Sequence, residues 1–232
     1  MKRIKIALIV ILFVFALFSM RITILRGIGE FLLVSSAPKK SDVIAILRGD
    51  RNFCCTIEAF KLFKEGYADV IYIPIALADT PILRLKERGI RLLIGQERIL
   101  SLLTQLGVPK ENVLVGKQKP GGGTFCELKR IKTMMQTRGY RMAIIVTSWY
   151  HTRRTDAICR KILRKSNLKY IIVGARNDFS SSSDWWRYRY EAISVLEEYV
   201  KLCMYYLSPF DKIRFSDDPE ETPSAVEEHR GE

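Results

Sequence analysis

The octapeptide Thr-Ser-Trp-Tyr-His-Thr-Arg-Arg, which ends at Arg154, carries the residues best suited to chemistry. It follows an apolar run and precedes a helical pattern, so its polar groups lie at the amino end of a helix. Backbone N–H groups and the helix dipole bind anions there. We therefore predict a phosphate site formed by Thr147, Ser148 and the adjacent arginines Arg153 and Arg154. His151 is then a general acid, general base or nucleophile, with a capping or packing role as the alternative.

A second polar group, Gly49-Asp50-Arg51, follows an earlier apolar run. Gly49 permits a tight turn, and Arg51 is a candidate phosphate contact. Asp50 is a candidate for orienting His151, or for holding a sugar hydroxyl or a metal. An ordinary surface turn is the alternative. There is no G-x-G-x-x-G, so the standard dinucleotide fingerprint is missing.

A third group, the glycine run that ends at Gly123 followed by Thr124 and Glu127, opens another helical pattern. T-x-x-E is the pattern of a capping box, in which the two side chains bond the first backbone N–H groups. The functional alternative is that Gly123 lets backbone amides approach a phosphate while Thr124 and Glu127 line the pocket, with Glu127 orienting His151. No lysine occupies the Walker position, so a P-loop is not predicted.

The cysteines give little support for a metal centre. There are five, and an odd number leaves at least one thiol free or in an intermolecular bridge. Cys54, Cys55 and Cys126 fall near the same predicted sheet edge as His151, but no C-x-x-C spacing supports zinc. A redox-sensitive contact between Cys55 and Cys126 is the other possibility, and no metal site is predicted.

Short apolar runs alternate with helical patterns along the body of the chain. The predicted strands are 42–47, 70–75, 112–115, 142–147 and 170–173. The predicted helices are 55–65, 80–89, 96–106, 124–138, 152–163 and 184–207, the last capped by Asp184. This alternation indicates an α/β protein with a Rossmann-like three-layer fold and a mostly parallel, five-stranded sheet. With strand order 3-2-1-4-5, the loops after the first and fourth strands meet where the order reverses, which is where such sheets bind ligands.

The N-terminus is typical of a membrane segment. Residues 1–5 include three basic residues, Lys2, Arg3 and Lys5, and residues 6–25 are almost entirely apolar, interrupted by Arg21. A span needs about 20 apolar residues, and an arginine near its end can reach the interface. We predict one uncleaved transmembrane helix within an anchor of residues 1–30, which contacts membrane lipid through 6–25. By the positive-inside rule, its N-terminus is cytoplasmic and the main domain lies outside the cell membrane.

The composition is that of a folded domain with attachments. The 232 residues are 48% hydrophobic and 27% charged, which excludes wholesale disorder. A linker (31–40), an α/β domain (41–210) and a disordered acidic tail (211–232) are predicted. The net charge is +13 although the tail is acidic, so the body favours an anionic small-molecule or lipid-linked partner. No specific nucleic acid is expected.

These motifs together resemble the YdcF-like family (domain of unknown function 218), whose members include SanA-type and ElyC-type envelope proteins. The resemblance covers about residues 40–207. It rests on Gly-Val-Pro before the third strand, T-x-x-E at a helix start, and V-T-S-x-Y-H-x-x-R from Val146 to Arg154. A tryptophan-rich start to the last helix, with Arg189 and Glu191, completes it. The resemblance implies a Rossmann-like domain and a role in cell-wall or envelope maintenance, without a defined reaction or cofactor.

The chain departs from that family in the turns after its first three strands. They read Leu47-Arg48-Gly49-Asp50, Pro74-Ile75-Ala76-Leu77 and Gly116-Lys117, where the family has a glycine-rich turn, Ser-Gly-Gly and an acid. The shift toward basic residues favours a more anionic ligand. Two functions follow: hydrolysis or transfer at a phosphate-bearing envelope precursor, or non-catalytic binding of an anion. Binding of S-adenosylmethionine or a nucleotide suits the fold, but the glycine-rich first loop is missing.

Overall fold

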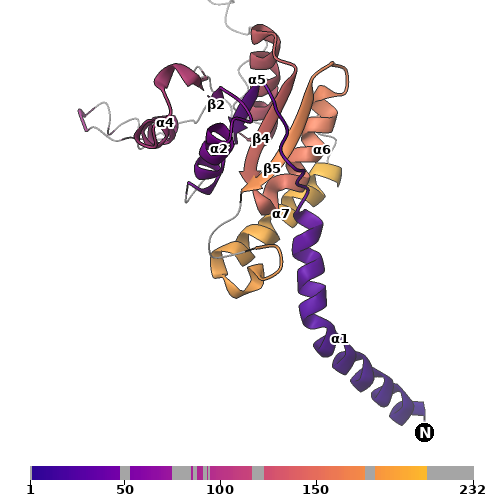
Figure 1. The fold of residues 1–232 in the computed structure, drawn as a ribbon. Helices are drawn as coiled ribbons and strands as arrows, with labels where there is room; N and C mark the ends of the chain where they lie inside the picture. Colours follow the sequence, from indigo (N-terminus) through magenta and orange to yellow (C-terminus); the bar gives the residue numbers. More distant parts are fainter. Residues whose placement is uncertain are drawn as a thin grey trace, which may run out of the picture.

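A wholly parallel, five-stranded sheet in the order β3-β2-β1-β4-β5 forms the centre of the molecule (Figure 1). The computed structural model describes residues 2–47, 53–74, 85, 88–90, 93, 95–116, 123–175 and 181–207. The strands are β1 (Val43–Ile46), β2 (Ile71–Ile73), β3 (Val113–Val115), β4 (Met142–Ser148) and β5 (Lys169–Ala175). The predicted Rossmann-like fold and strand order are confirmed.

Helices cover both faces of the sheet, which is why its strands are apolar on both sides. Ile44 and Ile46 of β1 pack toward α2 (Cys54–Lys64) and α4 (Gln96–Gln105). Val43 and Ala45, which alternate with them, pack toward α5 (Thr124–Arg138) and α6 (Thr152–Leu163). All four β1 side chains are buried. The three predicted layers are therefore present.

The start of the last helix differs from the prediction. The last helix does not begin at Asp184, because a 3-10 turn, η3 (Trp185–Arg187), precedes α7 (Arg189–Leu207). The Asp184 carboxylate instead accepts hydrogen bonds from the backbone N–H and the hydroxyl of Ser181, at 2.6 and 2.8 Å. The predicted cap is therefore wrong. Most of the predicted helix 80–89, and all of the tail 211–232, lie outside the described residues.

The N-terminal helix α1 (Lys2–Leu32) docks its carboxyl end against α7 and η3 and extends its amino end away from the domain (Figure 1). The indole N–H of Trp185 donates to the Leu25 carbonyl oxygen at 2.9 Å, and the Tyr199 hydroxyl donates to that of Ile28 at 2.8 Å. A third apolar cluster fills this junction. It comprises Leu32, Trp149, Trp185, Val195 and Leu202.

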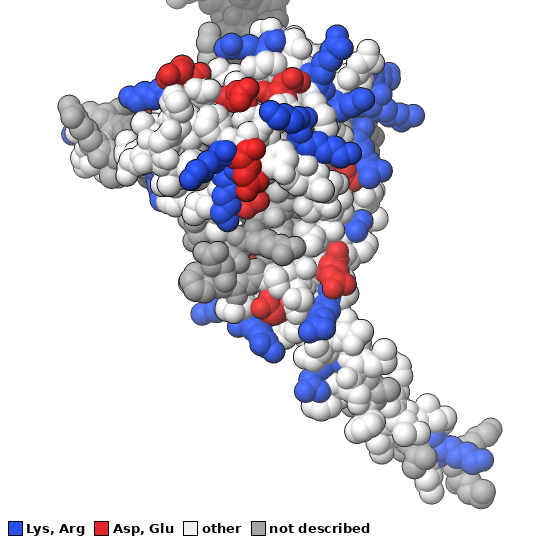
Figure 2. Space-filling view, in the orientation of Figure 1, with Lys and Arg blue, Asp and Glu red and all other residues white. Residues whose placement is uncertain are grey.

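Beyond the junction, the extending arm of α1 exposes mostly apolar side chains. Figure 2 shows the arm largely white, with basic residues at its tip and near the domain. Within the part of the chain that the structure describes, no single helix has the length and apolarity to cross a membrane. Two segments of α1, Arg3–Phe13 and Phe18–Leu32, are bent by 48° relative to each other and pass that test only as a pair.

The segment after α1 is bonded to the edge of the sheet. The backbone N–H of Val34 donates to the Thr152 hydroxyl at 2.8 Å, and that of Ser36 donates to the Ile172 carbonyl oxygen at 3.0 Å. The Thr152 hydroxyl also lies 2.8 Å from the Leu32 carbonyl oxygen. These bonds connect the end of α1 to α6, the helix that begins at the candidate site.

Candidate functional site

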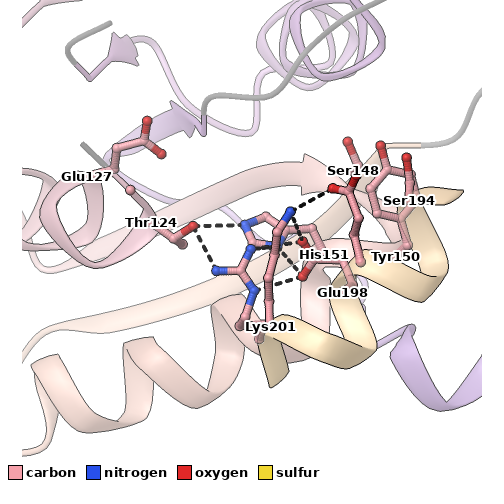
Figure 3. A pocket seen from close by; sticks show the side chains of 11 residues that line it. Thr124, Glu127, Ser148, Tyr150, His151, Ser194, Glu198 and Lys201 are labelled. Atoms are coloured by element: carbon pink, nitrogen blue, oxygen red, sulfur yellow. Dashed lines mark hydrogen bonds and ion pairs between the residues drawn. The ribbon is translucent and has the colours of Figure 1, made fainter. Parts of the chain in front are cut away.

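A cavity of about 340 Å³ lies at the carboxyl end of β4, between the amino end of α5 and the side of α7 (Figure 3). This is next to the β1–β4 boundary, where the strand order reverses and where the sequence predicts a ligand site. The described residues that line it are Gly123, Thr124, Glu127, Ser148, Tyr150, His151, Arg154, Ser194, Glu197, Glu198 and Lys201.

The short 3-10 turn η2 (Trp149–His151) places His151 at the wall of this cavity. β4 ends at Ser148, and α6 begins at Thr152 directly after the turn. The buried Thr152 hydroxyl lies 2.8 Å from the Trp149 carbonyl oxygen, and the Thr155 hydroxyl donates to the His151 carbonyl oxygen at 3.0 Å. The histidine backbone is therefore held on both sides.

His151 lies between a hydroxyl and a carboxylate. Its Nδ1 is 2.9 Å from Oε2 of Glu198, and its Nε2 is 3.2 Å from Oγ1 of Thr124. An ionised carboxylate only accepts hydrogen bonds, so Nδ1 carries the proton and donates to Glu198. When the ring is neutral, Nε2 is then an acceptor, and the Thr124 hydroxyl donates to it.

Arg154 closes this arrangement into a ring. Its Nε and Nη2 donate to the two oxygens of Glu198 at 2.8 and 2.9 Å, a bidentate pair. Its Nη1 donates to Thr124 Oγ1 at 3.2 Å. Nη2 also lies 3.0 Å from His151 Nδ1, so the two donors share the Glu198 carboxylate. Figure 3 shows the Thr124, His151 and Glu198 side chains of this arrangement next to one another.

Burial and pairing set the charge states of His151 and Glu198. Burial lowers the pKa of His151 from its usual 6.5, and the nearby Arg154 cation acts in the same direction, against the hydrogen bond to Glu198. The histidine is therefore neutral near pH 7 and able to accept a proton. Burial acts to raise the pKa of Glu198, but the hydrogen bonds from His151 and Arg154 outweigh it and hold that pKa well below its usual range. Glu198 is therefore ionised.

Tyr150 lies at the α7 side of the cavity with the hydroxyls of Ser148 and Ser194 (Figure 3). Burial raises the pKa of its phenol, while hydrogen bonds to the two serines act to lower it. The phenol is therefore protonated near pH 7. These three hydroxyls supply donors and acceptors beside the ring, but no charge.

Thr124 and Glu127 do not form the predicted capping box. The N-cap is Gly123, which adopts a φ of 90° that favours glycine, and α5 shows no side-chain capping bond there. The Thr124 hydroxyl faces His151 and Arg154 instead. Glu127 is 2% exposed and lines the cavity, on the side of Thr124 away from His151 in Figure 3. Of the functional alternative, the structure shows that Thr124 and Glu127 line the cavity. Glu127 does not orient His151, because the carboxylate that contacts the imidazole is that of Glu198.

The structure brings together most of the predicted site residues that it describes. His151, Glu127, Gly123, Thr124, Ser148 and Arg154 all line the cavity. Thr147 is 1% exposed within β4 and is not among the described lining residues. Arg153 extends toward α1, where it donates to the Phe31 carbonyl oxygen and stacks on the Phe31 ring at 4.0 Å. Gly49, Asp50 and Arg51 lie outside the described residues.

The predicted convergence of cysteines yields no metal centre in the described part of the chain. No group of three or more His, Cys, Asp or Glu side chains there could hold a metal ion. None of the five cysteines, all of which are described, forms a disulfide. Cys55 lies near the cavity, with its sulfur 4.0 Å from the Ser148 hydroxyl oxygen.

Sequence reasoning missed Glu198, the residue that orients His151. The signal was present in α7, where the buried face includes Val195 and Leu202. Glu198 falls three residues after the first and four before the second, so it lies on that same apolar face. A carboxylate there requires a buried partner. Lys201, one turn further on, lies 3.6 Å from Glu198 Oε1 and 3.0 Å from Glu197 Oε2.

No protein-family model matches the chain, and a comparison with curated proteins finds no significant match. Fold and site together define a Rossmann-like α/β protein with a hydroxyl, an imidazole and a carboxylate joined in series at the carboxyl edge of its sheet. The described lining includes three carboxylates and two cations, Arg154 and Lys201, and Arg154 is paired with Glu198.

Proposed function

We propose that this protein is an enzyme that hydrolyses, or transfers a group from, a phosphate-bearing substrate of the bacterial cell envelope. The observation that carries the proposal is the position of His151, neutral and buried, between the Thr124 hydroxyl and the Glu198 carboxylate. A histidine oriented in this way takes a proton from an attacking hydroxyl or water and returns it to the leaving group.

A phosphate in the cavity has two sources of stabilisation among the described residues. The amino end of α5 presents the positive end of its helix dipole beside Thr124. Arg154 offers a guanidinium whose Nη1 reaches the same hydroxyl. Because Glu198 holds Arg154 in a bidentate pair, a phosphate competes with that carboxylate rather than meeting a free cation.

The membrane anchor is part of the proposal. The exposed apolar arm of α1 and the basic residues at its start, Arg3 and Lys5, support contact with lipid. Cys203 tests the orientation, because its thiol is exposed on α7. In bacterial cells with a single membrane, a membrane-impermeant maleimide should label the full chain from outside, and Cys203→Ser should remove most of the label. Labelling only after lysis would place the domain in the cytoplasm.

The reaction is tested with the full chain in detergent and two chromogenic probes, p-nitrophenyl phosphate and bis(p-nitrophenyl) phosphate. We expect turnover of at least one probe, lowered about 10²-fold or more in His151→Asn, which removes the proton-accepting nitrogen. An asparagine variant with the melting temperature of the wild type and undiminished turnover would refute the role of His151.

The bidentate Arg154–Glu198 pair also supports a second candidate function, a binding module. In that module the hydrogen bonds that join Thr124, His151, Arg154 and Glu198 are purely structural. In that case neither probe is turned over, inorganic phosphate or a sugar nucleotide raises the melting temperature, and His151→Asn shows the same rise. A ligand at 100 times its Kd stabilises a protein by about 2.7 kcal/mol, which a thermal shift detects.

A further inference from the structure

We propose that Thr124 is the nucleophile of the reaction and forms a covalent intermediate with the substrate. This inference rests on the proposed function and deepens it. Its Oγ1 lies 3.2 Å from Nε2 of His151, whose other nitrogen is 2.9 Å from Glu198. A hydroxyl within reach of a base that a third group orients is the usual arrangement of an activated nucleophile.

The proton positions around Thr124 suit this role. Since Nδ1 donates to Glu198, Nε2 accepts, and the only proton available between Oγ1 and Nε2 is that of the hydroxyl. The oxygen has two lone pairs, and Arg154 Nη1 uses one of them at 3.2 Å. The second remains for attack, and the guanidinium stabilises the negative charge that develops on the oxygen as the proton leaves.

Thr124 is more exposed than His151 and Glu198, as a nucleophile that must contact the substrate has to be. Thr124 is half-buried at the start of α5, while the side chains of His151 and Glu198 are 10% and 6% exposed. A substrate entering the cavity therefore meets the hydroxyl first, and the imidazole and carboxylate lie behind it. Figure 3 shows Thr124 on one side of the imidazole and Glu198 on the other.

The proposed reaction needs no reactant other than the substrate and water. The Thr124 proton moves to His151 Nε2 while the Oγ1–P bond forms and the bond from phosphorus to the leaving oxygen breaks. The imidazolium then gives that proton to the leaving oxygen. Water attacks the phosphothreonine, loses a proton to Nε2, and displaces Oγ1, which recovers the proton. An alcohol in place of water converts hydrolysis into transfer.

Diisopropyl fluorophosphate tests the nucleophile without knowledge of the natural substrate. Reaction forms an Oγ1–P bond and breaks the P–F bond; fluoride leaves, and the hydroxyl proton passes to His151. With the full chain in detergent, we expect one diisopropylphosphoryl group on Thr124, located by peptide mass spectrometry. Thr124→Ser should be labelled and Thr124→Val not. His151→Asn should slow labelling about 10²-fold or more. Failure to label Thr124, or equal rates with asparagine, overturns the proposal.

A neighbouring hydroxyl provides the matched control, because Ser194 lines the same cavity. Ser194→Ala should keep the adduct on Thr124, whereas an adduct that disappears with this change would assign the nucleophile to Ser194. Melting temperatures of all variants separate loss of reactivity from loss of folding.

The same variants separate failure of this inference from failure of the proposed function. If Thr124→Val turns over p-nitrophenyl phosphate and His151→Asn does not, water attacks directly: the enzyme assignment stands and the covalent intermediate does not. If His151→Asn retains full turnover, the proposed function itself fails.

Discussion

Nδ1 of His151 lies 2.9 Å from Oε2 of Glu198, although 47 residues separate them in the chain. The histidine belongs to the turn after β4, and the glutamate belongs to the last described helix, α7. Since α7 also packs on the end of α1 through Tyr199, one helix connects the N-terminal segment to the site. Changes where α1 docks on α7 therefore have a physical route to the imidazole.

The first prediction concerns the protonation of His151. NMR titration should give a midpoint below 6.5, because burial and Arg154 disfavour the imidazolium; Lys201 acts in the same direction, and Glu198 opposes them. Glu198→Gln should lower the midpoint further, since it removes the group that raises this pKa. The sequence has two histidines, so His229→Asn leaves one signal to follow. A midpoint at or above 6.5 would contradict this account of the site.

The same titration has a consequence for folding. The unfolded chain binds a proton at His151 near pH 6.5, while the native state binds it only at lower pH. The free energy of unfolding should therefore fall as the pH drops below about 6.5. Urea denaturation at pH 7.5 and 5.5 measures this fall. His151→Asn should make it smaller, and an unchanged pH dependence would show that other groups cause it.

The second prediction concerns the buried ion pair. Glu198→Gln leaves Arg154 without its carboxylate, and breaking a buried pair costs about 3–5 kcal/mol of unfolding free energy. The neighbouring Glu197 is the control, because its pair with Lys201 is half-exposed, at 51% and 47%. Glu197→Gln should change stability by less than about 1 kcal/mol. Equal effects in urea denaturation would mean that burial does not distinguish the two carboxylates.

The third prediction concerns the docking of α1, where Gly29 lies against η3. A Cβ at Gly29 would lie 2.1 Å from the Ser182 carbonyl oxygen and 2.7 Å from Trp185 Cδ1. Gly29→Ala should therefore destabilise the protein by about 1–3 kcal/mol. Gly27, in the same helix, has nothing within 4 Å of such a Cβ. Gly27→Ala should stabilise the helix by roughly 0.5–1 kcal/mol. Melting temperatures that shift alike would disprove close docking at Gly29.

The fourth prediction concerns Thr152, whose buried hydroxyl joins the end of α1 to α6. Thr152→Val keeps the volume but leaves the Val34 N–H and the Leu32 carbonyl without this partner. The cost should be about 1–3 kcal/mol. Thr152→Ser keeps the hydroxyl and should retain most of the stability. Urea denaturation of the two variants measures the difference, and equal losses would assign the effect to packing of the methyl group.

Local patterns were sufficient for most of the fold. The helices 124–138 and 152–163 have the predicted bounds, because each is amphipathic and flanked by residues that end a helix or by a strand. The apolar strand runs predicted a sheet covered on both faces, since only buried strands tolerate such composition. The site location followed from the strand order, because parallel strands place their carboxyl ends on one edge.

The sequence by itself therefore determined the layers of this protein, the sheet edge where the cavity lies and the position of His151 at that edge, since these depend on patterns within short segments. Only the tertiary structure decided which partners the site residues choose. Thr124 has the right neighbours for a capping box, but its hydroxyl bonds His151, which comes from another strand's end. Glu198 lies on the apolar face of a long helix, but its partners are decided only when α7 packs that face against the site. Such choices depend on distances across the fold, where a buried charge must find its partner.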